Sequence, residues 1–395
     1  MTIIIFLLIL SLVVLIHELG HFLLAKKFGV WVKEFGIGFP PRLSKLFTWQ
    51  DTDFTLNWIP LGGFCAMDGE LEDLAAVEEE QKPSAKAEKS TLPTQALKKI
   101  TPAAKAKKFD YKKPWQKFFI IAAGPLMNLL LGAVIFMIVF SVEGIPEKQK
   151  EAVYIEEVAN EQTQLQAQTR ILTLESSSSG IIQATSNQTV IDFVQTHRGE
   201  LVEITTSGSC TTSGECNDEL LKAQVYVRTA EETPPGEGAL GITLSEYRVI
   251  FYPWYKQIPL SVVAGFAESW RSAKDLLIGL GQALGDLIIG KESEVVMMGP
   301  VGIVSQLNRQ QTFRHGWLVI LQFIGILSIN VGVMNLLPIP ALDGGRIILI
   351  FLEKFFGREK IAKFEIGLNY FGFIFLIVLT ILVTGQDIWR VFQGG

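Results

Sequence analysis

The sequence predicts a polytopic α-helical membrane protein with four transmembrane helices, a cytoplasmic membrane-reentrant β-hairpin and an outward α+β domain. Composition is the first reason, because 49% of the 395 residues are hydrophobic and the mean hydropathy is +0.32, too apolar for an ordinary soluble protein. The 19% of charged residues still leaves room for sizeable aqueous parts. Apolar runs are the second reason, because four segments approach the ~20 residues that cross a bilayer as a helix. They lie at residues 3–25, 118–142, 317–337 and 370–383, the last extended upstream to 366.

Positive charges near the ends of these segments predict their orientation. The first nine residues carry no charge, whereas Lys26 and Lys27 follow the first segment and six lysines stand between 105 and 117, before the second. Since Lys and Arg are retained on the cytoplasmic side, the connections 25–117 and 338–366 are predicted to be cytoplasmic. Both termini and the large 143–316 region then face outward. The first segment lacks the basic start and the cleavage site of a signal peptide, so we expect it to remain as a span.

The most informative motif is His17-Glu18-Leu19-Gly20-His21, which lies inside the first apolar segment. An ionisable side chain at mid-membrane costs roughly 2.5–3.5 kcal/mol, so this motif needs a functional reason. On a helix, positions 17 and 21 share one face, and both imidazoles can bind one zinc ion while Glu18 activates the attacking water. The alternative, a pair of satisfied core histidines, suits a soluble helix much better than a membrane span.

A third ligand is needed, because catalytic zinc usually takes three protein ligands and leaves one position open. His197 and His315 are predicted to lie on the outer side, at the wrong depth, and the second span contains no His, Asp or Glu. Asp343 is the remaining candidate. A surface Asp in a helix-terminating loop is the alternative.

The residues around Asp343 favour a turn that aims its carboxylate inward. Pro338 and Pro340 cannot continue a regular helix, so the third span ends near the cytoplasmic side. Gly344 permits a tight turn directly after Asp343. Non-helical backbone at this depth is tolerated only where it is buried in protein or lines a watery cavity.

Two asparagines in predicted spans are also of interest. Asn335 can donate toward an oxyanion, or it can serve as an ordinary helix-packing amide, and both readings stay open. Asn128 follows Gly124-Pro125-Leu126-Met127 at the start of the second span. Small residues there allow close helix approach, and for Asn128 a structural role, bonding to a neighbouring helix, is favoured.

Residues 35–68 alternate short apolar runs with Gly and Pro, which is typical of β-hairpin material. This segment is too apolar for a solvated loop, and directly after the motif-bearing helix it is predicted to dip back toward the membrane. Residues 69–113 change to Glu, Lys, Ala, Ser and Pro, a composition typical of a flexible cytoplasmic insert.

The outward region is predicted to hold a compact α+β domain at 143–250, with several short strands and one short amphipathic helix. A longer amphipathic helix at 266–287 follows, and it either packs on that domain or lies along the membrane surface. Cys210 and Cys216 flank a hairpin-tip composition and could form a small-loop disulfide in an oxidising compartment. Cys65, on the cytoplasmic side, is expected to remain a thiol.

Taken together, these motifs resemble the site-2 protease family of intramembrane zinc metalloproteases, in particular its bacterial RseP type. The resemblance runs through most of the chain and is carried by His-Glu-Leu-Gly-His at 17–21, Phe-Gly-Ile-Gly-Phe-Pro at 35–40, Pro-Leu-Gly-Gly-Phe at 60–64, Ala-Gly-Pro-Leu-Met-Asn at 123–128, Met-Gly-Pro-Val-Gly-Ile at 298–303 and the stretch from Asn335 to Arg346.

This resemblance implies a four-span protease that cleaves a transmembrane helix of its substrate. Such a substrate is often an anti-sigma factor already shortened by another protease. The resemblance also implies that the hairpin contacts the substrate strand and that an outer PDZ domain filters substrates by size. The chain departs from the family pattern in having room for one PDZ-like domain and no clear carboxylate-binding loop. A run of four serines at 176–179 stands near the expected turn.

The resulting hypothesis is an intramembrane endopeptidase with one Zn²⁺ per chain, held by His17, His21 and Asp343, with Glu18 as the general acid–base group. It cleaves single-span membrane proteins such as anti-sigma factors or signal-peptide remnants, in the inner (cytoplasmic) membrane of a bacterium. A helix hides its carbonyl groups, so the substrate must unwind, and a strand edge in the hairpin would hold it extended. The expected substrate-binding residues are Asn335, Phe54, Leu56, Trp58, Gly62 and Gly63, and Asn128, Pro338, Pro340 and Gly344 support the site.

The expected organisation follows the chain in eight parts. They are the first transmembrane helix (1–34), the hairpin region (35–68), the insert (69–113), the second transmembrane helix (114–142), the PDZ-like domain (143–250), the amphipathic helix region (251–316), the third transmembrane helix with Asp343 (317–346), and the fourth with the C-terminus (347–395). Apart from a substrate and the lipid bilayer, no partner is indicated, and the mildly acidic chain lacks a basic surface for nucleic acid.

Two other functions stay open. One is a membrane-anchored zinc peptidase that acts on non-membrane substrates, which would need the histidine motif outside the bilayer. The other is a metal-binding membrane scaffold without hydrolysis, which would not need Glu18 beside the first ligand.

Overall fold

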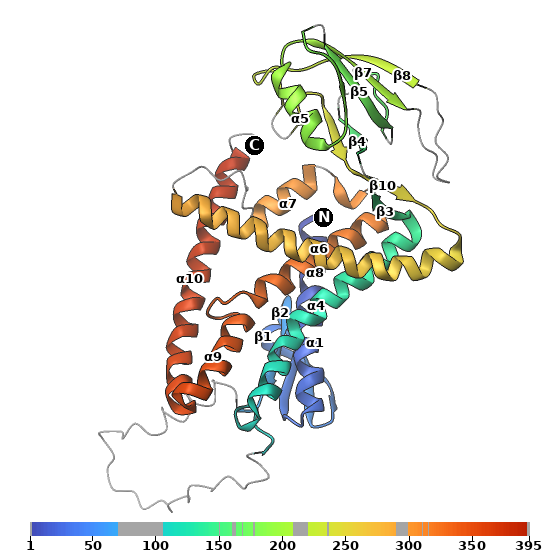
Figure 1. Cartoon of the computed structure of the whole chain (residues 1–395). Helices are drawn as coiled ribbons and strands as arrows, with labels where there is room; N and C mark the ends of the chain where they lie inside the picture. The colour runs from blue at the N-terminus through green and yellow to red at the C-terminus, as the bar shows by residue number, and fades with distance from the viewer. Residues whose placement is uncertain are drawn as a thin grey trace, which may run out of the picture. The chain divides into compact units, whose positions relative to one another are not determined.

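The computed structural model describes residues 2–69, 106–149, 151–159, 163–167, 169–176, 178–207, 220–234, 237–289, 299–309, 311–314 and 316–392. The chain divides into two compact units, which are treated separately. The helical unit comprises Met1–Phe136 with Phe266–Gly394, and the sheet unit comprises Met137–Gly265. Figure 1 colours both along the chain.

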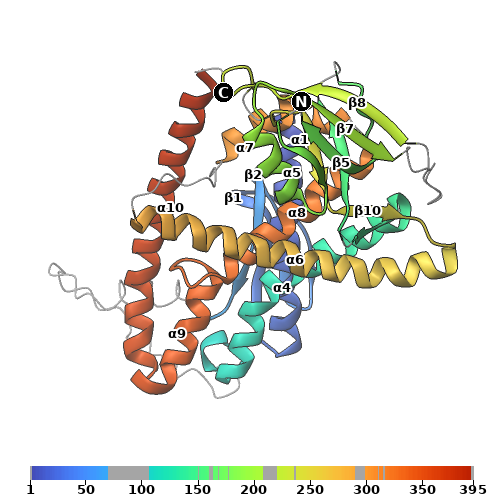
Figure 2. The same ribbon diagram turned by 45° about the horizontal axis from the view of Figure 1, so that its top comes forward.

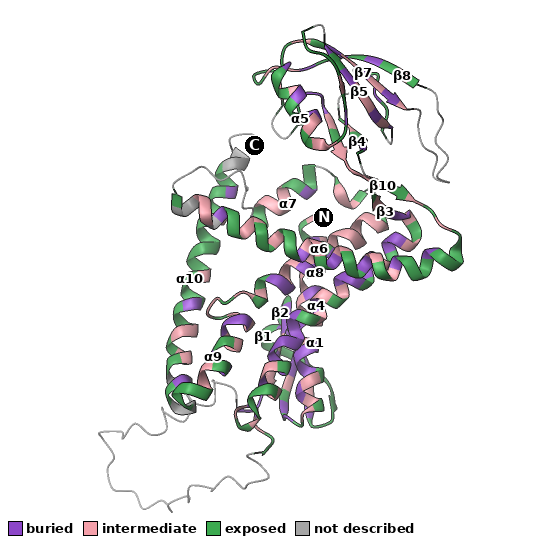
Figure 3. Cartoon of the chain, in the orientation of Figure 1, coloured by how far each residue is buried: buried purple, intermediate pink, exposed green. Residues whose placement is uncertain are grey.

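Four helices in the described part of the chain are long and apolar enough to cross a membrane, which confirms the predicted number of spans. They are α1 (Thr2–Lys27), α4 (Pro114–Glu143), α8 (Trp317–Leu336) and α10 (Arg358–Phe392), whose apolar part runs from Phe364 to Trp389. Figures 1 and 2 show α10 at the side of the helical unit, next to α9. Buried residues gather along α1 and α4 in Figure 3, whereas only 6% of the apolar window of α10 is buried.

Small residues bring α1, α4 and α8 close together. A Cβ added to Gly20 of α1 would overlap the backbone carbonyl of Ala123 in α4. On the other side of α4, a Cβ on Gly332 of α8 would lie 2.9 Å from the carbonyl oxygen of Pro125. Glycines at these points let the backbones approach, which is how membrane helices gain packing contacts.

The third span ends as the prolines predict. Helix α8 stops at Leu336, a short non-helical stretch follows, and a separate helix, α9 (Asp343–Phe356), begins at the predicted metal ligand. A Cβ on Gly344 would overlap the carbonyl oxygens of Leu336 and Leu337, so the turn requires glycine. The fourth span follows only after α9, which begins in the predicted 317–346 part and continues into the predicted 347–395 part.

The predicted β-hairpin is present, but its two strands are bent so that they form a sheet of four paired segments. Its strands are β1 (Val32–Trp49) and β2 (Thr52–Met67), and both are irregular. In the pairing register, Phe35 lies opposite both Cys65 and Phe54, and Leu56 lies opposite both Ile37 and Ser44. Four segments therefore lie side by side in the order 63–67, 32–37, 53–56 and 42–49. The 53–56 segment is interior, and 63–67 is at one edge.

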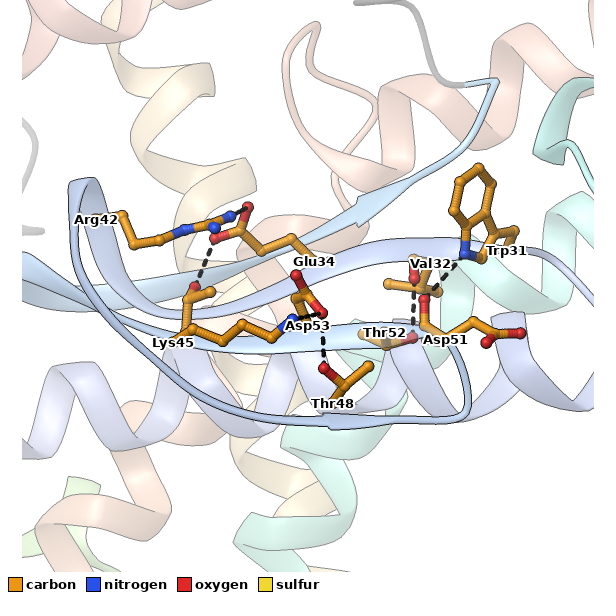
Figure 4. A network of polar contacts seen from close by, with 10 residues as sticks. Trp31, Val32, Glu34, Arg42, Lys45, Thr48, Asp51, Thr52 and Asp53 are labelled. Atoms are coloured by element: carbon orange, nitrogen blue, oxygen red, sulfur yellow. Dashed lines mark hydrogen bonds and ion pairs between the residues drawn. The ribbon is translucent and has the colours of Figure 1, made fainter.

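Aromatic packing and ion pairs hold this sheet together. The ring of Phe22 in α1 lies 5.4 Å from that of Phe35 and 5.6 Å from that of Phe54, between ring centroids. Figure 4 shows the polar contacts that join the segments. They include Arg42 with Glu34 at 2.5 Å, Lys45 with Asp53 at 2.6 Å, and hydrogen bonds from Thr48 to Asp53 at 3.0 Å, from Thr52 to the Val32 carbonyl at 2.8 Å and from the Trp31 indole to the Asp51 carbonyl at 3.0 Å.

The sheet lies along α1 over much of its length. At one end, the Lys26 ammonium donates to the carbonyl of Gln50. At the other, the Ser11 hydroxyl donates to the Pro60 carbonyl at 2.8 Å and accepts from the Gly62 amide at 3.1 Å. Fifteen residues of helix separate these two contacts, a rise of about 22 Å.

The insert lies largely outside the described residues, but its two ends meet. The Phe109 amide donates to the Asp68 carbonyl at 2.8 Å, and the Trp31 amide donates to the Lys107 carbonyl at 2.9 Å. A short 3₁₀ turn, η1 (Phe109–Tyr111), then leads to α4. The chain thus leaves the sheet and returns to it at one place.

Three helical elements of the described chain directly precede α8 in the sequence. Helix α6 (Trp254–Ile289) begins in the sheet unit and is longer than the predicted 266–287, and α7 (Pro300–Arg309) and η2 (Thr312–Arg314) follow. On the apolar face predicted for α6, Ala273 is buried, but Trp270 is 74% exposed. The Asp387 carboxylate of α10 accepts from the Gly302 amide at 2.8 Å, near the start of α7.

The sheet unit contains the predicted mixture of strands and a helix. Its elements are β3 (Ile145–Lys148), β4 (Val153–Val158), β5 (Arg170–Ser176), β6 (Gly180–Gln183), α5 (Asn187–Thr196), β7 (Leu201–Ser207), β8 (Leu220–Tyr226), β9 (Ile242–Ser245) and β10 (Tyr247–Ile250). The main sheet has the order β8-β7-β5-β4-β9, with β6 paired to β5, and β3 pairs with β10. Alternate side chains of its strands and Phe193 of α5 form one core. Cys210 and Cys216 lie outside the described residues.

Candidate metal centre

The histidine motif lies on a regular part of α1, where apolar residues precede and follow it. His17 and His21 are one turn apart and face α4, and each is only 6% exposed. Buried imidazoles in an apolar helix need polar partners. The structure supplies one to each: the His21 Nδ1–H donates to the Ile120 carbonyl at 2.9 Å, and Asn128 lies 3.4 Å from the His17 Nδ1.

Asp343 joins the two histidines, as the sequence predicts. Its Oδ2 lies 3.0 Å from His17 Nε2 and 3.3 Å from His21 Nε2, and the two Nε2 atoms lie 3.1 Å apart. Ligands bound at ~2.1 Å to a tetrahedral zinc ion lie about 3.4 Å from one another. The three atoms therefore form nearly one face of such a tetrahedron.

The hydrogen bonding of these atoms also fits a cation. Because His21 gives its Nδ1 proton to a carbonyl, its Nε2 points a lone pair at the other two ligand atoms. Asp343 Oδ2 is buried and has no hydrogen-bond partner in the described chain. Lone pairs that converge in a buried site repel one another unless a proton or a metal ion lies between them, and three converging ligand atoms suit a metal ion. Two imidazoles and a carboxylate are a ligand set that zinc takes.

Helix α4 forms the wall behind the two histidines. A Cβ on Gly124 would overlap His21 Nε2 and lie 2.8 Å from His17 Nε2. The absence of a side chain at this position leaves room for the ligand atoms. The sequence predicted that Gly124 allows close helix packing and placed it in a motif of the family resemblance, but it did not predict contact with the histidines.

A cavity of about 270 Å³ opens beside the ligand atoms, large enough for several water molecules or part of a peptide. Glu18 and Asn335 line this cavity together with the three ligands. The Asn335 amide donates one N–H to the Val331 carbonyl at 3.0 Å, one turn back in α8. An amide has a second N–H, so this bond is compatible with both predicted roles of Asn335.

The sheet reaches the cavity through the segment that follows the predicted Gly62-Gly63 pair. Phe64, Cys65 and Met67 line it. Gly62 and Gly63 are adjacent and pack against α1, where a Cβ would meet side chains of Val14 and Leu15. Ala341 in the loop before α9 and Arg346 in the first turn of α9 also line the cavity.

The expected substrate residues at 54–58 lie elsewhere in the sheet. Phe54 packs in the aromatic cluster, with its ring 4.5 Å from that of Phe47. Leu56 is paired on both sides, so its backbone is not at an edge. The Trp58 side chain is 65% exposed, at the far end of the sheet from Gln50. The edge that meets the cavity is 63–67, so only the last residues of the predicted 54–64 edge lie at it.

Comparison with known proteins agrees with this chemistry. The profile of the family described as Peptidase family M50 matches residues 5–379. Zinc metalloprotease RasP of Bacillus licheniformis is 28% identical over 99% of both chains, and that of Geobacillus kaustophilus is 26% identical over 99% of this chain and 98% of its own. A Fusobacterium nucleatum relative, whose name also assigns it to the zinc metalloproteases, is 30% identical over the whole of both chains.

The family profile covers nearly the whole chain, including all four membrane helices except the end of the last. The relatives are aligned end to end with this chain, so the similarity is not confined to a short motif. The chain therefore belongs to peptidase family M50, the site-2 protease family, and is a zinc metalloprotease of the bacterial inner membrane.

Proposed function

We propose that this protein is an intramembrane endopeptidase that cleaves the transmembrane segments of single-span proteins. The observation that carries the proposal is the position of the ligand cluster. His17 and His21 lie within an apolar, membrane-length helix, and Asp343 meets them from the start of α9, which follows the third membrane-length helix. A site built in this way can reach a peptide bond inside the bilayer.

In the proposed site, His17, His21 and Asp343 hold one zinc ion, which would acidify a water molecule and polarise the substrate carbonyl. Glu18 lines the same cavity. Its carboxylate accepts the proton of the attacking water and then delivers that proton to the leaving amine. The second N–H of Asn335 is available to the oxygen of the scissile carbonyl as negative charge develops on it.

The sheet is proposed to enter the membrane beside α1. Lys26 and Lys27 mark the cytoplasmic end of this span, and the contacts of Ser11 show that the sheet reaches fifteen residues further along the helix. Exposed apolar side chains on the sheet suit a lipid environment, among them Phe39, Phe47 and Trp58. A membrane-impermeant thiol reagent should label a cysteine at Lys33 much faster than one at Trp58. Equal labelling would reject the re-entry.

The edge at 63–67 is proposed to receive the unwound substrate strand. Backbone groups of an extended peptide cost several kcal/mol each in hydrocarbon unless they are paired. This edge pairs with β1 on one side and lines the cavity that holds Glu18. Strand addition would therefore lay the substrate across the metal centre.

The sheet unit is proposed to be a PDZ-like domain that limits the size of the outer part of the substrate. Its serine turn does not resemble an open carboxylate-binding site, because Glu200 accepts hydrogen bonds from Ser176 at 2.8 Å and Ser178 at 3.0 Å. These bonds hold the pKa of Glu200 below its usual value. These hydroxyl groups therefore already bind a carboxylate of the protein itself and not that of a peptide, which favours a steric filter over peptide binding.

We further propose that the termini and the sheet unit face outward, and that the substrate is a single-span protein such as an anti-sigma factor shortened by another protease. Removing the sheet unit should then relax the discrimination between short-tailed and long-tailed versions of one substrate. An unchanged size preference would reject the filter.

The decisive experiment for the function is incubation of the purified protein with single-span substrates in detergent or vesicles. Cleavage within the span, lost on zinc chelation and restored by zinc, is the expected result. Cleavage confined to soluble segments would favour a membrane-anchored peptidase. Zinc binding without cleavage of any tested span would favour a scaffold.

A further inference from the structure

We infer that Asn128 of α4 is the positioning residue of the metal ligand His17, holding its imidazole in the tautomer that presents Nε2 to the zinc ion. The sequence assigned Asn128 only a structural contact between helices. This inference rests on the proposed ligand role of His17 and concerns the group that fixes its orientation.

The chemistry of His17 requires an acceptor at its Nδ1. Its Nε2 faces Asp343 and His21, so for metal binding the lone pair must be on Nε2 and the proton on Nδ1. A buried N–H needs an acceptor. Metal-bound histidines almost always donate this second N–H to a carboxylate or carbonyl oxygen, which fixes the ring.

Asn128 is the group at that position. Its side-chain amide is 3.4 Å from His17 Nδ1, and the residue is fully buried. The oxygen and nitrogen of an amide are assigned from their surroundings. In the arrangement with nitrogen toward His17, the Oδ1 atom is buried with no partner in the described chain. With the oxygen toward His17, Oδ1 accepts the Nδ1 proton, which is the arrangement that zinc binding requires.

The imidazole of His21 is oriented in the same way, by an acceptor on the same helix, α4. There the Ile120 carbonyl accepts the Nδ1 proton at 2.9 Å. Residues 120, 124 and 128 follow one face of α4, where Gly124 lies against both ligand atoms. Beside His17 Nδ1, the polar group that α4 presents is the Asn128 side-chain amide, at 3.4 Å. The backbone carbonyl of Asn128 accepts the Ser328 hydroxyl of α8 at 2.9 Å. The acceptor for His17 is therefore a side chain, whereas the acceptor for His21 is a backbone carbonyl.

Neighbouring helices hold this amide in place. A Cβ on Gly332 of α8 would lie 3.2 Å from the Cβ of Asn128, so α8 packs closely over it. The amide therefore has little freedom to turn away from His17. A residue that served only to pack α4 against α8 could be replaced by an apolar side chain of similar volume without affecting the metal.

The test measures zinc binding by the full-length protein in detergent. Asn128→Leu keeps the volume and removes the acceptor, Asn128→Ala removes the acceptor without a bulky group, and Asn128→Asp keeps the oxygen acceptor. Ser328→Ala is the matched control, since it removes a buried hydrogen bond to the same residue but not the acceptor. Zinc affinity is measured by chelator competition, and Co²⁺ spectra report the ligand geometry.

Asn128→Leu and Asn128→Ala should bind zinc about 10- to 100-fold more weakly, the usual cost of losing such a partner. Asn128→Asp and Ser328→Ala should stay within a few-fold of the wild type and keep its Co²⁺ spectrum. Normal zinc affinity in a folded Leu or Ala variant would overturn the inference, as would equal losses in the Asp and Ala variants.

The His17→Ala variant distinguishes a failure of the positioning role of Asn128 from a failure of the proposed metal site. If it loses zinc while Asn128→Ala does not, the positioning role is wrong and the proposed metal site stands. If His17→Ala itself keeps full zinc affinity, the ligand assignment is wrong and the proposed function falls with it.

Discussion

Gly124 of α4 lies against the Nε2 atom of His21 so closely that a Cβ at this position would overlap it. The backbone of one membrane helix is thus the wall of a metal centre carried by another. The first prediction follows: Gly124→Ala should displace both imidazoles and lower zinc affinity by ~10-fold or more, since overpacking costs about 1–3 kcal/mol.

The matched control is Gly367→Ala in α10, where an added Cβ has no neighbour within 4 Å. Zinc content measured by atomic spectroscopy on both purified variants is the check. Full zinc occupancy in Gly124→Ala would mean that α4 lies further from the ligands than the structure places it.

Glu18→Gln should separate metal binding from catalysis. The amide keeps the size of the side chain but cannot accept the proton of water. We expect near-normal zinc content with cleavage reduced by ~10²-fold or more, the lower end of the contribution of positioned acid–base groups. His17→Ala, His21→Ala and Asp343→Ala should lose zinc and activity together. Loss of zinc in Glu18→Gln as well would make Glu18 a structural residue.

The substrate edge can be tested with proline. Neighbouring amides of a strand point to opposite sides, so of Phe64 and Cys65 one amide faces β1 and the other faces away from it. Proline at the outward position should abolish cleavage while zinc binding persists, because it removes a donor to the substrate strand. Alanine at each position is the control. If both proline variants cleave like their alanine controls, this edge does not hold the substrate.

Ser11 is predicted to fasten the sheet to α1 inside the bilayer. Its hydroxyl serves both the Pro60 carbonyl and the Gly62 amide. Ser11→Ala leaves these two backbone groups unpaired, at a cost of about 1–3 kcal/mol. We expect a lower melting temperature and weaker cleavage with unchanged zinc content. Ser141→Ala is the control, because its hydroxyl bonds only to its own helix, at Met137. Equal melting temperatures for the two variants would count against the fastening role.

Replacing residues 70–105 with a short glycine–serine linker should preserve the metal centre. The chain leaves the sheet at Asp68 and returns at Phe109, and these residues are joined by a backbone hydrogen bond. A short linker can therefore close the gap without moving either end. We expect unchanged zinc content and basal cleavage of a short-tailed substrate. Loss of zinc would show that the insert takes part in building the site.

Much of the site could be predicted from the sequence because the positions of its residues depend on local properties of the chain. Two histidines four residues apart share a helix face whatever surrounds the helix. The cost of burying them in hydrocarbon then calls for a metal. The prolines after α8 restrict the backbone directly and the glycines after Asp343 permit a tight turn, and the structure has the break and the new helix there.

The position of the substrate edge was not predictable in the same way. Residues 54–64 have the composition of strands, and the sequence predicted a substrate edge along the whole of this segment. The register instead puts Phe54 and Leu56 between two other segments and leaves 63–67 at the edge. Side-chain patterns show that a segment is extended, but which segments pair depends on how a bent sheet packs against α1.

The sequence by itself predicted four spans, the paired histidines, Glu18 as the proposed acid–base group and Asp343 as the proposed third ligand, since each follows from hydrophobicity, helix geometry or backbone conformation. Only the tertiary structure decided what surrounds them. Gly124 and Asn128 contact His17 across more than a hundred residues of chain. Such contacts depend on the crossing of two packed helices, and no periodicity within either helix encodes where they cross.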